Sequence, residues 1–246
     1  MVFCNEKRLS TVSVFDSHEN AETLSHGALR HELAKRLLIE IFQGKMPEGT
    51  RLIAMNLAAR FGVSSTPVRE ALFELEASEV IEVIHNRGAV VKRFGREELR
   101  EIFQMRRLIE SEAARLACPR IDKAVLDGLR QKLKELAKRR PNAKWLELEM
   151  AADRELHAMI AANCGSARLA KEFERYHMLV EALRSVVGYE RRALSDAVTM
   201  HLAIVNAMIA RDPDAAAAAM ANHIELAGRS AELAVFGKKS SEKTGD

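Results

Sequence analysis

The sequence has few of the residues that mark disulfide-bonded or membrane-bound proteins. Its only cysteines, Cys4, Cys118 and Cys164, are odd in number, widely spaced and without a CxxC pair. This pattern argues against a disulfide framework and against a zinc site made of thiolates. No apolar run approaches the length of a membrane span, and the first residues lack the apolar core of a signal peptide. We therefore expect a cytoplasmic protein with reduced thiols and no membrane partner.

Aromatic residues are also scarce, and the net charge is small. Aromatics make up 5% of the 246 residues, against a hydrophobic fraction of 48% and a charged fraction of 30%. This composition favours a soluble protein built from helices rich in alanine and leucine, with room for one or two domains. The formal net charge of +3 is too small to indicate nucleic-acid binding by itself, so any positive surface must be local.

The most informative segment covers residues 61–75 and reads FGVSSTPVREALFEL. Gly62 predicts a tight turn, and Pro67 is expected at the first position of a helix that begins with three hydroxyl caps, Ser64, Ser65 and Thr66. Apolar residues then recur at helical spacing, so one face packs while Arg69 stays free. A helix entered through a short turn is typical of helix-turn-helix proteins, although other all-α proteins contain such segments too.

The flanks of this segment favour the helix-turn-helix interpretation. The chain before it predicts two helices, and the chain after it predicts two β-strands joined by a hairpin turn, His85-Asn86-Arg87-Gly88. The predicted elements are helices at 28–42 and 51–60 and β-rich runs at 80–84 and 89–92. Three short helices followed by a hairpin predict a winged helix-turn-helix domain over residues 28–94.

Three motifs occur in order in this region: GKMPEGTRL, LAARFGVSSTPVREALFELEASEVIEV and NRGAVV. They resemble the DNA-binding domain of the GntR family of bacterial transcription regulators. The resemblance implies contacts with double-stranded DNA from the turn, the helix after it and the wing. The candidates are Arg51, Ser64, Ser65, Thr66, Pro67, Arg69, Arg87 and Gly88, with Lys92 and Arg93 as further cations that could meet phosphates. For each charged residue, the alternative is an ordinary solvated side chain.

Ser65 departs from the family pattern. Family members commonly carry an arginine directly before the Thr-Pro pair, where this chain has Ser65. If that arginine reads a guanine edge, its loss removes a contact worth about 1–3 kcal/mol of discrimination between bases. We therefore predict a relaxed or altered operator, with Arg69 as the main base-contacting candidate of this helix.

The chain outside residues 28–94 divides into two terminal segments and one long helical region. We expect residues 1–27 to form a mobile N-terminal arm, with packing on a partner subunit as the alternative, and residues 238–246 to form a C-terminal tail. Residues 95–237 lack strand-like alternation and predict an antiparallel α-helical bundle, so the fold class is mainly α. The expected helices lie at 96–117, 122–139, 143–163, 167–188, 192–211 and 213–235.

One group of residues in this helical region can bind a metal. Asp153 and His157 are four residues apart on one predicted helix, so their side chains share a face, while His201 and His223 lie on later helices. One carboxylate and three imidazoles suit zinc, nickel, manganese or iron, with zinc first. From spacing alone, however, ordinary polar positions on amphipathic helices are the favoured interpretation of these histidines.

Three further motifs change that balance: RRLIESEAARLA, DRELH and HLAIVNAMIARDPDAAAAAMANH. They resemble the helical FCD domain of the FadR-type branch of the same family. The resemblance implies a metal site made by Asp153, His157, His201 and His223, and an effector-binding role for Arg106, which precedes Glu110. Ser166 replaces the usual Asn after Gly165, but serine caps helices equally well. Relatives of this type are homodimers, which implies a palindromic operator.

The sequence therefore predicts a ligand-responsive regulator that senses a small organic acid in a metal-containing helical domain. We expect a repressor, because repression that is relieved by an effector is the commoner mode of regulation. Two alternatives are a metal sensor, in which the ion is the signal, and a metal-dependent enzyme. The enzyme is disfavoured because no motif such as HExxH supplies a general base. Several residues could line the effector pocket or be ordinary core: Met150, Leu156, Tyr176, His177 and Tyr189.

Overall fold

A computed structural model describes residues 25–84, 87–188 and 191–237. The chain divides into two compact units. One unit runs to Phe94 and includes residues 178–186, and the other starts at Gly95 and takes residues 95–177 with those from 187 onward. Several predicted features lie outside the described residues. They are most of the N-terminal arm, the tail at 238–246, His85 and Asn86 of the hairpin turn, and Tyr189.

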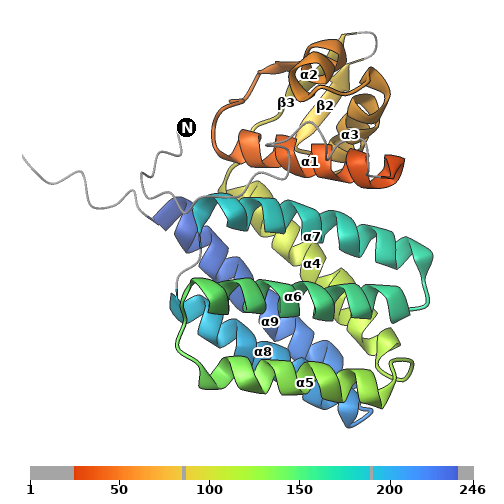
Figure 1. Ribbon diagram of the computed structural model, residues 1–246, viewed down its shortest axis with the longest axis vertical. Helices are drawn as coiled ribbons and strands as arrows, with labels where there is room; N and C mark the ends of the chain where they lie inside the picture. The colour runs from red at the N-terminus through yellow and green to blue at the C-terminus, as the bar shows by residue number, and fades with distance from the viewer. Residues whose placement is uncertain (1–24, 85–86, 189–190, 238–246) are drawn as a thin grey trace, which may run out of the picture. The chain divides into compact units, whose positions relative to one another are not determined.

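Helix α1, His26–Phe42, opens the first unit (Figure 1). The Ser25 side chain caps it by accepting a hydrogen bond of 3.4 Å from the backbone N–H of Ala28. Leu33, Leu37 and Ile41 recur at helical spacing and are buried, as expected for a helix that packs along one face.

The segment after α1 differs from the predicted second helix at 51–60. Residues Arg51–Leu52 form a short strand, β1, and helix α2 begins only at Ala54, covering Ala54–Phe61. In β1, Arg51 lies opposite Val90 and Leu52 opposite Ala89. Backbone pairing with a strand forty residues away therefore overrides the local helical pattern, a competition that sequence periodicity cannot reveal.

Helix α3, Ser65–Ala77, follows a turn at Gly62, which ends α2 in the left-handed conformation with φ of 68°. The N-cap is Ser64, but its side chain makes no capping hydrogen bond. Pro67 is the third helical residue rather than the predicted first. Proline is tolerated there because N–H groups of the first turn have no partner within the helix. The predicted packing face is confirmed, since Val68, Ala71, Leu72 and Leu75 are buried.

The predicted wing is a hairpin of β2, Ile81–Ile84, and β3, Gly88–Val91. With β1 they form a three-stranded antiparallel sheet in the order β1-β3-β2. Gly88 has a φ of 87°, and a Cβ added to it would lie 2.6 Å from the backbone oxygen of Leu52. Only glycine fits this crossing point between the wing and β1.

From Arg96 onward the described chain is helical apart from short connections, and residues 178–186 of α7 fall in the first unit. The helices begin and end within two residues of the predicted ranges. They are α4, Arg96–Ala117; α5, Lys123–Lys138; α6, Ala143–Asn163; α7, Ala167–Val187; α8, Arg191–Ile209; and α9, Pro213–Phe236. Side chains of Asp122, Asn142 and Asp212 cap α5, α6 and α9. Across the described ranges, no helix is both long and apolar enough to cross a membrane.

Five of these helices form a closed ring of contacts. Helix α4 packs on α9, α9 on α8, α8 on α5, α5 on α6, and α6 on α4 (Figure 1). The interior is mostly apolar and includes Leu99, Leu133 and Ile204. It also holds a set of buried polar and charged side chains, Arg106, Glu110, Glu149, Asp153, His157, His201 and His223. Burying so many polar groups is costly unless they have partners or a ligand, which marks this interior as a candidate site.

Candidate metal centre and DNA-binding face

The four predicted metal ligands meet inside the helical ring. Asp153 and His157 lie one turn apart on α6, His201 comes from α8 and His223 from α9. Their side chains are buried: Asp153 keeps 10% of its side-chain surface exposed, His157 keeps 2% and His201 none. Each of the four residues offers one donor atom, and these atoms all lie within 4.8 Å of one another.

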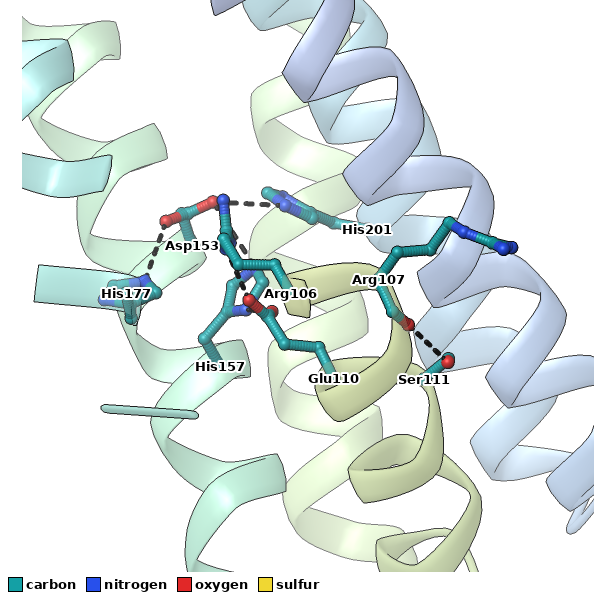
Figure 2. Close-up of polar contacts among 8 residues, drawn as sticks. All are labelled: Arg106, Arg107, Glu110, Ser111, Asp153, His157, His177 and His201. Carbon is teal, nitrogen blue, oxygen red and sulfur yellow. Dashed lines mark hydrogen bonds and ion pairs between the residues drawn. The ribbon is translucent and has the colours of Figure 1, made fainter. Parts of the chain in front are cut away.

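The spacing of these donors fits a metal ion. Imidazole nitrogens and carboxylate oxygens lie about 2.1 Å from zinc, so two ligands of one ion are at most about 4.2 Å apart. A cluster spanning 4.8 Å would need to contract by only a fraction of an ångström. Asp153 Oδ1 lies 3.3 Å from His201 Nε2 and 3.7 Å from His157 Nε2, which places these donors around a common point (Figure 2). The donor set also suits nickel, manganese and iron.

Glu110, which sequence reasoning treated only as a neighbour of Arg106, belongs to this site. Its Oε2 atom lies 2.9 Å from Nδ1 of His157, and its Oε1 atom accepts a 2.6 Å hydrogen bond from Nε of Arg106 (Figure 2). A carboxylate that engages the outer nitrogen of a histidine fixes the ring and leaves the other nitrogen for a metal. The available sequence signal was the four-residue spacing from Arg106, which puts both side chains on the inward face of α4.

Arg106 is held inside the bundle. Its side chain is 1% exposed, and it forms a buried ion pair with Glu110. The Nη1 atom of Arg106 has no hydrogen-bond partner in the described part of the chain. The guanidinium is therefore a buried positive charge whose Nη1 nitrogen remains available to a further partner, close to the candidate metal-ligand cluster.

The protonation states of Glu110 and His157 fit metal binding. Burial by itself raises the pKa of Glu110, but the charge of Arg106, together with its hydrogen bond and the contact with His157, outweighs burial and holds that pKa at about 2. Burial lowers the pKa of His157, against the opposite influence of Asp153 and Glu110. A charged Glu110 beside a neutral His157 is the arrangement that a metal ion requires, because only a neutral imidazole binds it.

The DNA-binding candidates of the first unit fall into two groups. Arg51, Arg69 and Arg87 are exposed, on β1, α3 and the wing, and none has an ion-pair or hydrogen-bond partner among the described side chains. Ser64 and Thr66 are exposed, and Ser65 is half-buried at the start of α3. Pro67 is buried and Gly88 is half-buried against β1, so these two shape the fold rather than present side chains to a ligand.

The comparison with known families agrees with both units. Residues 29–91 match the model of bacterial regulatory proteins of the gntR family, and residues 101–226 match that of the FCD domain. The chain belongs to the GntR family of bacterial regulators and carries an FCD domain. The family consists of DNA-binding transcription regulators rather than enzymes, and the FCD architecture fits the FadR-type branch.

Several GntR-family relatives are similar over most of the chain. A probable D-xylose utilization operon transcriptional repressor of Paenarthrobacter nicotinovorans is 27% identical over 206 residues, which is 83% of this chain and 89% of that one. The transcriptional regulator McbR of Escherichia coli is 28% identical over 189 residues, 66% of this chain and 85% of that one. The solved structure of E. coli McbR/YncC, 23% identical, has the same fold, with a TM-score of 0.62 over 82% of this chain and 95% of that chain.

Proposed function

We propose that this GntR-family regulator is a metal-containing repressor that responds to a small organic acid. The observation that carries the proposal is the convergence of four buried donors, from three helices, within 4.8 Å inside the FCD domain. A protein that needed only a stable bundle would fill this interior with apolar side chains, because buried polar clusters are costly. Names of relatives support the repressor assignment, since several are called operon repressors.

In this proposal Asp153, His157, His201 and His223 hold a divalent ion, with zinc first and nickel, manganese or iron as alternatives. The ion would supply a positive centre that attracts a carboxylate. Glu110 fixes the ring of His157, and the free Nη1 donor of Arg106 gives the acid a second contact. A ligand bound here alters regulation only if it favours one arrangement of the bundle over another.

The proposed DNA binding depends on exposed arginines. Arg69 on α3 would reach into the major groove, while Arg51 and Arg87 would meet phosphates or the minor groove. We propose a homodimer, because two copies of α3 then read the two halves of a palindromic operator. Ser65, in place of the arginine common in the family, would relax or alter the preferred operator.

Thermal melting with ligand panels tests this function. The purified protein is melted with sugar acids, hydroxy acids, dicarboxylates and fatty acyl compounds, each with and without a chelator. A ligand that binds only the folded state raises the melting temperature. We expect one class of acid to raise it, the chelator to abolish that effect, and the same acid to release operator DNA.

Other outcomes of this experiment identify the alternatives. Operator binding that follows free metal with no response to any acid would indicate a metal sensor. Metal-dependent consumption of a bound acid would indicate an enzyme. If chelation leaves both the melting temperature and the DNA binding unchanged, the proposed metal centre is wrong.

A further inference from the structure

His177 touches the metal-ligand cluster from outside. It lies on α7, and its Nε2 atom is 3.6 Å from Oδ2 of Asp153 (Figure 2). The other oxygen of that carboxylate, Oδ1, faces His201 Nε2 at 3.3 Å and His157 Nε2 at 3.7 Å. The two oxygens of Asp153 therefore have different surroundings, one toward the cluster and one toward His177.

The position of His177 differs from that of the cluster histidines. Its side chain is 18% exposed, compared with 2% for His157 and none for His201. Its ring centre is 5.1 Å from that of His157, and its polar contact within the site is the outward oxygen of Asp153. His177 is also absent from the set of donors that converge within 4.8 Å. Geometry thus separates it from the ligands and places it in the layer around them.

The same division of atoms occurs at His157. There the outer nitrogen, Nδ1, lies 2.9 Å from Glu110, while the inner nitrogen, Nε2, faces Asp153. Asp153 and His157 sit one turn apart on α6, so two neighbouring ligands each have an inner atom for the cluster and an outer atom beside a polar group of another helix. Outer partners of this kind orient metal ligands and tune their affinity.

We propose that His177 is a positioning residue that holds Oδ2 of Asp153, so that Asp153 offers Oδ1 alone to the metal ion. This inference rests on the proposed metal centre. A distance of 3.6 Å exceeds hydrogen-bond range, so the proposal requires the His177 ring to approach Oδ2 by roughly a few tenths of an ångström when the ion binds. By occupying one oxygen, His177 prevents two-oxygen binding by Asp153 and leaves space at the ion for an effector carboxylate.

The test compares two substitutions of His177 in the full-length protein. Leucine in His177→Leu has no N–H group, whereas glutamine in His177→Gln keeps a donor for Oδ2 but is a poor metal ligand. Zinc affinity is measured by competition with a chromophoric chelator, and the visible spectrum of the cobalt-loaded protein reports ligand geometry. We expect His177→Leu to bind zinc about 10–100-fold more weakly and to change the cobalt spectrum. His177→Gln should stay close to wild type in both measurements.

Controls separate this role from the alternatives. His31→Leu makes the same change outside the site and should leave zinc affinity unchanged. Melting of the metal-free proteins checks that both His177 variants fold. Equal losses of zinc affinity in His177→Gln and His177→Leu would make His177 a ligand and overturn the positioning role. Wild-type zinc affinity in His177→Leu would also overturn it, because His177 would then have no role in metal binding. If wild-type protein takes up no zinc, or if Asp153→Ala binds it as tightly as wild type, the metal centre itself fails.

Discussion

Glu110 lies with its Oε2 atom 2.9 Å from Nδ1 of His157, and both side chains are almost completely buried. Its second oxygen binds Arg106, so one carboxylate joins a buried cation to a proposed metal ligand. Arg106 and Glu110 come from α4 and His157 from α6. These three side chains therefore link the ion pair on α4 to the cluster of candidate metal ligands. Any change at Glu110 should therefore be felt both in stability and in metal binding.

Replacing Glu110 with leucine should destabilise the metal-free protein by about 3–5 kcal/mol, because it leaves the charge of Arg106 buried without a partner. The double variant Arg106→Met/Glu110→Leu should recover most of that loss, since it removes both charges. Urea unfolding of the metal-free forms measures the difference. Both variants should still bind zinc more weakly than wild type, because His157 loses its outer partner. A double variant as unstable as the single one would contradict the buried ion pair as the cause.

If the proposed metal centre is correct, removal of the ion should lower the melting temperature. An ion at about 100 times its dissociation constant stabilises the folded state by about 2.7 kcal/mol. For a chain of this size that corresponds to a shift of about 5–10 °C. The measurement is thermal melting with zinc and with a chelator. His201→Ala should show no difference between the two conditions, and a zinc-dependent shift that persists in this variant would place the ion elsewhere.

Arg69 should be essential for operator binding. It is exposed near the start of α3 without a protein partner in the described structure, so Arg69→Ala should weaken binding while leaving the fold unchanged. We expect the loss to be about 1–3 kcal/mol if Arg69 contacts a base edge. Gel-shift titrations at fixed salt measure it, and an equal loss on unrelated DNA would show that Arg69 contacts only phosphates.

Ser65→Arg should change operator preference. The substitution restores the arginine that family members commonly carry before Thr66, and a guanine contact adds about 1–3 kcal/mol of discrimination. Selection of bound sequences from a random pool, with wild type and variant in parallel, measures the preference. Identical selected sequences would mean that position 65 does not read the operator.

The contact between His31 and Glu74 should make the DNA-binding unit sensitive to pH. His31 Nδ1 lies 3.0 Å from Glu74, and this hydrogen bond raises the pKa of His31 above its ordinary value of 6.5. The contribution is thus complete below about pH 6.5 and is lost as pH rises through the higher folded pKa. The pKa of Glu74 is lowered by the same bond, so the contribution also falls when acid protonates Glu74.

The variant His31→Gln tests this dependence. Both side chains are partly exposed, so the stabilisation is small, about 0.2–1 kcal/mol. The gap in melting temperature between wild type and variant should be largest near pH 6 and should shrink toward pH 9. A gap that stays constant over that range would assign the effect to packing rather than to charge.

The bundle was predictable from the sequence because its signals are local. Apolar periodicity marked each helix, and breakers and caps such as Asn142 and Asp212 marked the ends. Strand β1 was missed because Arg51 and Leu52 are extended only by pairing with β3. The start of α3 was misplaced because Ser64 is the N-cap by backbone conformation, without a side-chain hydrogen bond.

The convergence of the four candidate metal ligands was predictable from the sequence only in part. Asp153 and His157 share a face of one helix, but their convergence with His201 and His223 depends on how three helices pack. Family resemblance supplied that link. Glu110 and His177, which lie around this cluster, come from yet other helices, α4 and α7, and no spacing along the chain connects them to α6.

The distribution of the four donors over α6, α8 and α9 links metal binding in the proposed centre to the packing of all three helices. No pair of helices holds the full set, and α9, the last helix of the described chain, contributes His223. An ion that needs all four donors can therefore bind only after α9 has packed. If the proposed metal centre is correct, a chain truncated before α9 would therefore not be rescued by added zinc.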